Sequence, residues 1–130
     1  MFTVTQIKDA HSKVKSGADF PKYIQEIKDL GVQGFETFVA DSHTDYFGAD
    51  NFKTSSPSMY NTLIIADKSN KEQFIKCLKS HQQGATDYLT FCNDCAVNGI
   101  EKWIVDLDKM TCIYYDKSGN EMLVENIPSV

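Results

Sequence analysis

The sequence repeats itself at a spacing of 68 residues, without gaps. When the chain is shifted along itself by this distance, identical residues coincide at several places: Ile7 with Ile75, Asp19 with Asp87, Gly31 with Gly99 and Tyr46 with Tyr114. Conservative pairs, such as Phe35 over Trp103, keep the same register. Self-similarity at one fixed offset is typical of a structural unit that occurs twice. The pattern therefore predicts two copies, at about residues 1–57 and 69–128, joined by residues 58–68.

The length of the chain favours a single domain over residues 1–130. A chain of 130 residues has the length of one ordinary domain, and a unit of about 65 residues would be marginal by itself, so the copies should share one core. No run of 18 apolar residues is present, and the first residues, MFTVTQIKDAHSKVK, lack the pattern of a secretory signal. These features predict a cytoplasmic protein without a membrane contact, whose four cysteines are reduced thiols.

All of the basic residues are lysines. The sequence has 13 of them and no arginine, so it lacks the planar guanidinium that makes paired contacts to phosphate and guanine. The formal net charge is −5, and residues 32–50 hold four acidic residues and no lysine. This distribution predicts that nucleic acid is not a partner, because a cation or a basic partner suits such a segment better than DNA.

Apolar spacing and capping residues predict four helices, over residues 5–17, 20–30, 69–84 and 87–98. Thr5 is the expected cap of the first helix, and Ser69 with Glu72 has the spacing of a capping box before the third. Glycines close the last three helices, at or just after their predicted ends. Each copy should therefore contain a helical hairpin.

Alternating apolar residues predict strands over residues 35–39, 44–46, 103–107, 110–114 and 121–124. A two-residue turn at Asp108 and Lys109 places all the apolar side chains of the second hairpin on one face. Asp41 and Ser42 are the expected turn residues of the first hairpin. We expect residues 49–58 to form a loop and the apolar residues 59–66 to form a linking strand. The result is an α+β fold, a tandem pseudo-symmetric duplication of a helix-helix-β-meander unit, with helices packed on one face of an antiparallel sheet.

The cysteines allow a metal site. Cys92 and Cys95 form a Cys-x-x-Cys pair, and Cys77 and Cys112 would complete a set of four thiolates for zinc. Structural zinc usually draws on two close pairs, whereas the second pair here is replaced by two separate cysteines. A redox pair normally uses a helix N-terminus to stabilise the thiolate, and this pair falls in the middle of a predicted helix.

The internal repeat favours a structural role for the same cysteines. Cys92 and Cys95 occupy the positions of Ile24 and Ile27, which lie in the centre of an apolar helix stripe. A free cysteine at such a position serves as a small hydrophobic residue. Core packing is therefore the preferred interpretation, and the zinc site and the redox pair remain as alternatives.

A polar patch is predicted on the first hairpin. If this hairpin keeps the register of the second, its outer face carries Glu36, Phe38, His43, Asp45 and Phe47, with Asp41 at the turn. Glu36 and Asp45 would then oppose each other directly, an arrangement that sheets normally avoid. A divalent metal held by Glu36, His43 and Asp45 would compensate, as would a raised carboxyl pKa suited to acid/base catalysis. The alternative is a solvated sheet face without a site.

No catalytic or cofactor motif stands out elsewhere in the sequence. His11 and His81 fall at the edges of their helix stripes and are expected to be boundary residues rather than ligands. Ser55, Ser56 and Ser58 lack the glycines of a nucleophile elbow, and no phosphate-binding loop or dinucleotide fingerprint is present.

Much of the sequence resembles a family of small uncharacterised bacterial proteins, a domain of unknown function. The resemblance is carried by the stretches MFTVTQIKDAHSKVKSGADFP, HTDYFGA, NKEQFIKCLKSHQQGATDY, FCNDCA and KWIVDLDKMTCIYYDKSGNEMLVE. Some members of that family are prophage-borne and carry the label phage envelope protein. The resemblance thus implies a bacterial or prophage origin, and it implies no reaction, cofactor or catalytic residue.

Two functions from different classes follow from these observations. The first is a non-enzymatic cytoplasmic interaction module that binds a protein partner or itself, with Phe38 and Phe47 as contacts. The second is a small metal-dependent or acid/base enzyme that uses Glu36, His43 and Asp45. No cofactor is expected for the first function, and a divalent metal is expected for the second.

Overall fold

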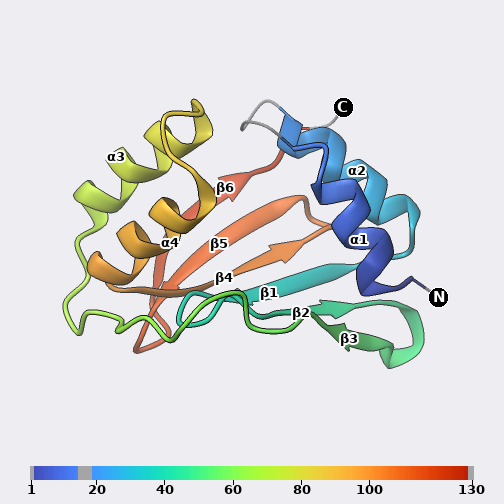
Figure 1. Cartoon of the computed structure of the whole chain (residues 1–130), viewed down its shortest axis with the longest axis horizontal. Helices are drawn as coiled ribbons and strands as arrows, with labels where there is room; N and C mark the ends of the chain where they lie inside the picture. Colours follow the sequence, from blue (N-terminus) through green and yellow to red (C-terminus); the bar gives the residue numbers. More distant parts are fainter. Residues whose placement is uncertain (1, 15–18, 129–130) are drawn as a thin grey trace.

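The computed structural model describes residues 2–14 and 19–128 (Figure 1). Two helices and three strands follow one another, and the same order then occurs again. The first set consists of α1 (Val4–His11), α2 (Phe20–Asp29), β1 (Gly34–Phe38), β2 (Thr44–Phe47) and β3 (Lys53–Ser55), with a short 3-10 turn, η2 (Ala49–Asn51), before β3. The second set consists of α3 (Lys71–Gln82), α4 (Tyr88–Val97), β4 (Ile100–Asp106), β5 (Thr111–Asp116) and β6 (Glu121–Asn126). The fold is α+β, as predicted.

Helices α1, α3 and α4 begin at residues whose side chains cap the first turn. Thr3 begins α1 through a capping box in which its Oγ1 accepts from the Gln6 amide at 3.2 Å, while its own amide donates to Gln6 Oε1 at 2.8 Å. The predicted cap at Thr5 is therefore wrong by two residues. Asn70 caps α3, which corrects the predicted box of Ser69 and Glu72. The first helix ends at His11, six residues before its predicted end near Gly17, so that prediction is wrong.

The six strands form one antiparallel sheet in the order β3-β2-β1-β4-β5-β6, so the two sets of strands meet at β1 and β4. The predicted hairpin registers are confirmed, since Glu36 pairs with Asp45 and Trp103 pairs with Tyr114. The first turn lies slightly earlier than predicted, at residues 39–41. Ser42 follows it with a φ of 63° and is buried.

Two predictions for the central connection are wrong. The expected loop at residues 49–58 contains β3, which pairs with β2 at the edge of the sheet. The expected linking strand at residues 59–66 is irregular. Its backbone amides bond instead to the first turn and to α4. Leu63 N donates to Ala40 O at 2.7 Å, and Ala66 N donates to Ala96 O at 2.9 Å. We call residues 56–66 the strap.

All four helices lie on one side of the sheet (Figure 1). Side chains alternate along each strand, so one face of the sheet packs against the helices and the other forms what we call the open face. The sheet contributes residues such as Phe35, Val105 and Leu107 to the core, and the helices contribute residues such as Ile24 and Phe74. Among residues 2–14 and 19–128, no helix is long and apolar enough to cross a membrane.

Candidate functional site

The open face carries a continuous row of six side chains, one from each strand. In the order of the sheet, the row consists of Ser55, Asp45, Glu36, Ile104, Ile113 and Val124. The half on β1 to β3 is polar, and the half on β4 to β6 is apolar. This division follows directly from the sequence, because the two hairpins carry different residues at matching positions.

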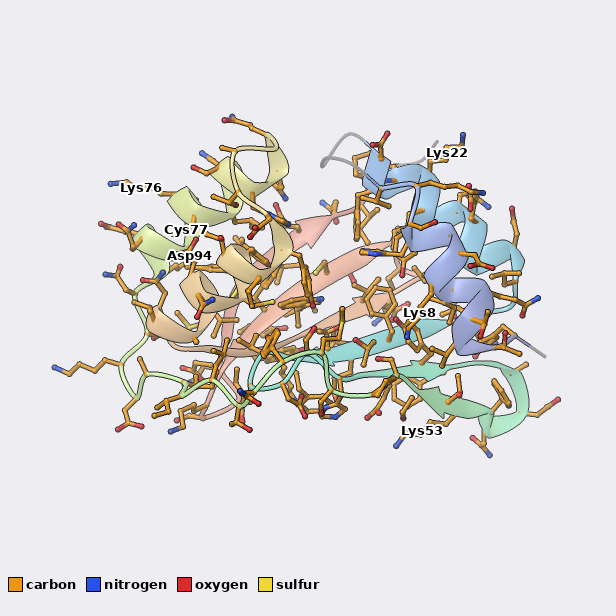
Figure 2. All side chains as sticks on the ribbon, in the orientation of Figure 1. Lys8, Lys22, Lys53, Lys76, Cys77 and Asp94 are labelled. Carbon is orange, nitrogen blue, oxygen red and sulfur yellow. The ribbon has the colours of Figure 1, made fainter. Side chains whose placement is uncertain are left out.

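The two opposed carboxylates of this row are each matched by a lysine. Lys102 Nζ lies 3.2 Å from Glu36 Oε2, and Lys53 Nζ lies 3.8 Å from Asp45 Oδ2. Ser55 Oγ also donates to Asp45 Oδ1 at 2.6 Å. Lys53 projects from β3 on the side away from the helices (Figure 2). The like charges of Glu36 and Asp45 are thus compensated from neighbouring strands. Sequence reasoning missed both lysines because their positions depend on the pairing of β2 with β3 and of β1 with β4.

Asp41 and His43 form a close pair at the end of the first hairpin. His43 Nδ1 lies 2.6 Å from Asp41 Oδ1, and the same oxygen accepts from the His43 amide at 3.0 Å. Ser58 Oγ, on the strap, donates to the other oxygen of Asp41 at 2.8 Å. Partial burial acts to raise the pKa of Asp41, but the hydrogen bonds from His43 and Ser58 outweigh it, so the pKa is lowered.

The ring of His43 is held in place by Phe38. The two rings stack with centroids 4.4 Å apart and planes 8° from parallel. This contact leaves Phe38 half-buried, whereas Phe47 is 39% exposed. Lys102 Nζ lies 5.9 Å from the centre of the Phe38 ring and 5.7 Å from that of Tyr115, close enough for cation–π attraction to both.

The three residues of the predicted acid/base or metal site have different partners. Glu36 contacts Lys102, Asp45 contacts Lys53 and Ser55, and His43 contacts Asp41. Within the described part of the chain, no group of three or more His, Cys, Asp and Glu side chains is arranged to hold a metal ion. What the geometry does provide is a carboxylate that orients an imidazole through Nδ1.

Three of the four cysteines belong to the hydrophobic core. Cys92, Cys95 and Cys112 are buried, while Cys77 is half-buried on α3 (Figure 2). Burial raises the pKa of the Cys92 and Cys95 thiols, and it raises the pKa of Cys112 to about 12. These side chains are therefore thiols at neutral pH, which is the form expected of small hydrophobic residues and not of nucleophiles.

The other two histidines contact aromatic rings of the helical hairpins. His11 packs edge-on against Tyr23 with centroids 5.1 Å apart, and burial lowers its pKa. His81 stacks on Phe91 at 4.5 Å, and its Nδ1 lies 3.1 Å from Thr86 O. His81 is half-buried, as expected of a boundary residue, whereas His11 is exposed apart from its contact with Tyr23.

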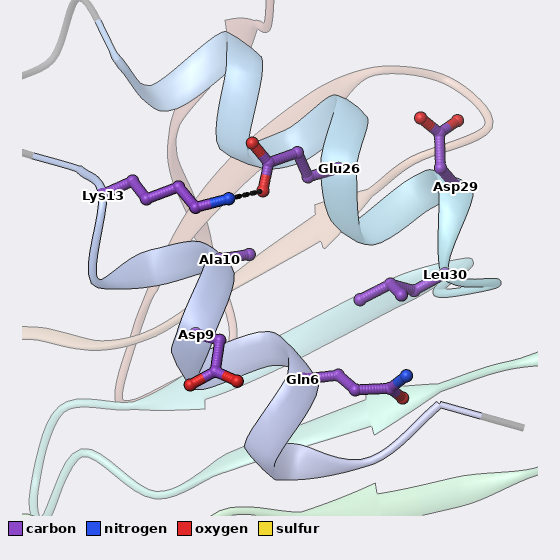
Figure 3. A pocket seen from close by; sticks show the side chains of 7 residues that line it. All are labelled: Gln6, Asp9, Ala10, Lys13, Glu26, Asp29 and Leu30. Atoms are coloured by element: carbon purple, nitrogen blue, oxygen red, sulfur yellow. Dashed lines mark hydrogen bonds and ion pairs between the residues drawn. The ribbon is translucent and has the colours of Figure 1, made fainter.

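An open groove of about 390 Å³ lies between α1 and α2 (Figure 3). It is lined by Gln6, Asp9, Ala10, Lys13, Glu26, Asp29 and Leu30. Lys13 Nζ lies 3.5 Å from Glu26 Oε2 across the groove. Nothing in the sequence pattern signalled this groove, because its residues are the ordinary polar faces of two amphipathic helices. An open, shallow groove of this kind does not exclude water from a reacting group.

Comparison with known proteins places the chain in a family but gives it no activity. No curated protein matches the sequence. The family model described as "Protein of unknown function (DUF1398)" matches residues 8–126, which is well over half of the 130 residues. The predicted resemblance to an uncharacterised family is thereby confirmed. The chain belongs to the DUF1398 family of proteins of unknown function.

Proposed function

We propose that the chain is a non-enzymatic binding module that holds a protein partner on the open face of its sheet. The observation that carries this proposal is the apolar half of the row described above. Val124 is 52% exposed, and Ile104 and Ile113 are half-buried on a face that none of the described helices covers. Apolar side chains gathered on one solvent-facing surface are typical of sites that are covered by another molecule.

The charges around this apolar surface support a protein as the partner. Glu36 and Asp45 are each paired with a lysine of the same face, so the surface has little net charge to attract an ion or a nucleic acid. Tyr115 and Phe38 flank Lys102 and add aromatic area. An apolar centre with aromatic residues and a rim of paired charges is the usual anatomy of a protein interface. The partner therefore presents an apolar patch with a polar rim.

This proposal can be tested without knowing the partner. The test measures how strongly a single introduced cysteine is protected from chemical labelling in living cells. A Val124→Cys variant places a thiol on the open face, and a Lys76→Cys variant places one on the exposed surface of α3. Both are labelled with a membrane-permeant maleimide, in cells and as dilute purified protein, with the unmodified chain as background. We expect Val124→Cys to be labelled several-fold more slowly in cells, and Lys76→Cys to react equally in both settings.

Equal labelling of Val124→Cys in both settings would contradict the proposal. A second change on the same face makes the test specific. Adding Ile113→Ser to the Val124→Cys variant removes apolar contact area beside the thiol and should restore fast labelling in cells. Protection that persists in this double variant would have a cause other than apolar docking on the open face.

We also propose that the two sets of elements arose by duplication, in a bacterial or prophage gene whose product is cytoplasmic. The support is the 68-residue self-similarity and the recurrence of the same order of elements. Comparing other members of the family with themselves tests the duplication, because the same offset should recur in them. A phage envelope role would in addition require that the protein be found in purified virions.

The close pair of Asp41 and His43 favours an acid/base or metal-dependent enzyme as a second candidate. A carboxylate on Nδ1 fixes the ring orientation and leaves Nε2 as the atom that would accept a proton or bind a metal. Mass spectrometry of metal content in protein purified without chelator tests the metal-dependent form of this enzyme. About one manganese, iron or zinc ion per chain that is lost in His43→Ala would support the enzyme, and a metal-free protein would remove its metal-dependent form.

A further inference from the structure

The sheet has two edge strands, and they differ in how well they resist pairing with another chain. β3 has three residues and carries the exposed Lys53, and a very short strand with a lysine is a common way to block an edge. β6, at the opposite edge, has six residues without a lysine or a proline (Figure 1). After an irregularity at Met122, residues 123–126 pair regularly with β5. β6 is therefore the edge that is suited to accept a further strand.

Two residues of β6 have backbone groups that point away from the sheet. The Ile127 amide donates to Met110 O at 2.8 Å, so residue 127 faces β5. Residues along an antiparallel strand alternate between bonding to one neighbour and pointing to the other side. The N–H and C=O groups of Val124 and Asn126 therefore point outward, and no hydrogen bond from the described residues reaches them. Such a row of unpaired groups is complementary to the backbone of an extended segment.

The apolar half of the open-face row ends at this free edge. Val124 is its last member, next to Ile113, and is 52% exposed. Directly paired residues of an antiparallel ladder project to the same side of a sheet. A strand added to β6 would thus place one side chain beside Val124 on the open face, and an apolar residue there would extend the row. Backbone pairing and apolar contact are therefore available at the same place.

Glu125 gives the charge of the segment that fits. Its side chain is half-buried and lies on the helix side of the sheet, where Gln82 Nε2 donates to its two oxygens at 3.2 and 3.4 Å. Glu36 and Asp45 are each matched by a lysine, whereas no lysine or histidine of the described residues forms an ion pair with Glu125. A half-buried carboxylate without a counter-charge favours a cation beside it. The residue of an added strand that lies opposite Glu125 is therefore basic.

We propose that β6 binds an extended segment of the protein partner as a seventh strand, with an apolar side chain beside Val124 and a lysine or arginine opposite Glu125. The added strand is antiparallel, like every other pair in the sheet. This inference rests on the proposed function, because the segment belongs to the partner that covers the open face. A second copy of this chain does not fit, since its own free edge carries Glu121 and Glu125 and no lysine.

A synthetic peptide tests strand addition directly. The probe is a short, capped peptide of alternating lysine and valine, which in the proposed register places valine beside Val124 and lysine opposite Glu125. Amide hydrogen exchange of the full chain is followed residue by residue by NMR. We expect saturating peptide to slow exchange at Val124 and Asn126 at least about tenfold, and to change little at Leu123, which already bonds to β5. Unchanged exchange at Val124 and Asn126 with millimolar peptide would overturn the proposal.

Backbone methylation of the peptide separates strand addition from simple charge attraction. Methyl groups on the valine nitrogens remove the donors that face β6 and should abolish the protection. Methyl groups on the lysine nitrogens lie on the far side of the added strand and should leave the protection intact. Equal protection by the two methylated peptides would exclude backbone pairing.

A charge variant tests the contact assigned to Glu125. Glu125→Gln should weaken binding of the unmethylated peptide about threefold, because it removes a partly buried ion pair. The matched control is Glu72→Gln, on the exposed surface of α3, which removes the same charge and should leave the affinity unchanged. Equal effects of the two changes would overturn the pairing of a basic residue with Glu125.

The Asn126→Pro change links this inference to the labelling of Val124→Cys in cells. It removes an outward N–H without affecting the bonds to β5, whereas Asn126→Ala keeps that N–H. Adding Asn126→Pro to Val124→Cys should restore fast labelling, and adding Asn126→Ala should not. Protection that survives Asn126→Pro would overturn strand addition and leave the proposed function intact. If Val124→Cys alone is unprotected, the proposed function fails, and the peptide result then decides whether β6 accepts a strand.

Discussion

Lys102 is the residue that allows Glu36 and Asp45 to face each other on the open face. Its side chain is 29% exposed and that of Glu36 is 20% exposed, so their ion pair is only partly screened by water. We expect Lys102→Met to lower the free energy of unfolding by about 1–2 kcal/mol, because it leaves a half-buried carboxylate beside a like charge. Urea unfolding at pH 7 measures this change.

The matched control for this prediction removes the charge as well as its partner. A Glu36→Gln change combined with Lys102→Met eliminates the uncompensated carboxylate, and we expect it to recover most of the stability. If the single Lys102→Met variant is as stable as the parent chain, the lysine does not compensate the opposed carboxylates. The cross-strand repulsion would then be negligible on this face.

Asp41 makes the stability of the first turn depend on pH. Its pKa is lowered from 3.8 in the folded chain, so the ionised form is favoured by folding. The contribution is fully present above pH 3.8 and is lost as the pH falls from there through the lower folded pKa. We therefore expect the stability difference between the parent chain and Asp41→Asn to shrink as the pH falls below about pH 4.

Chemical denaturation at closely spaced pH values measures this difference. Ser58→Ala is the informative companion, because it removes one donor to the carboxylate while His43 keeps the other. When Ser58→Ala is present in both chains, the pH-dependent part of the stability difference caused by Asp41→Asn should be smaller but still measurable. A difference that grows below pH 4 would mean that protonated Asp41 is the stabilising form, contrary to the sign argued here.

At the scale of elements, the parts that depend on local patterns could be predicted from the sequence. The hairpin registers follow from period-two alternation and turn length, which is why the opposition of Glu36 and Asp45 was predictable. The helices follow from their stripes and glycines, with errors of one or two residues at their starts, although the first helix ends six residues before its predicted end. Such errors arise because several polar residues near a helix start can act as the cap, and only the backbone geometry selects one.

The parts that depend on distant partners could not be predicted. The apolar composition of the strap suggests a strand, but its amides bond to the first turn and to α4, which are remote in sequence. The short edge strand β3 has a turn-like composition, and its pairing with β2 overrides that preference. The lysines that neutralise the carboxylates of the open face come from β3 and β4, so the candidate site was predicted without its counter-charges.

The cysteines of α4 allow a direct comparison of packing with metal binding. If Cys95 serves as a small hydrophobic residue, we expect Cys95→Ala to cost about 1–2 kcal/mol and Cys95→Ser to cost more, because a hydroxyl in the core needs a hydrogen-bond partner. If Cys95 is a zinc ligand, both changes should be severe and similar. Thermal or urea unfolding of the two variants distinguishes these outcomes.

A chelator provides the control for the same comparison. The parent chain should unfold at the same denaturant concentration with and without EDTA, because a core thiol gains nothing from a metal. A clear loss of stability in EDTA would instead indicate that the four cysteines bind zinc. It would also show that the raised thiol pKa values belong to a metal-free form of the protein.

At the scale of the whole molecule, the helices and the proposed contact surface lie on opposite sides of the sheet (Figure 1). The row from Ser55 to Val124 crosses all six strands on the open face. Its paired charges come from the first set of strands and its apolar residues from the second, so the contact surface forms only because β1 pairs with β4.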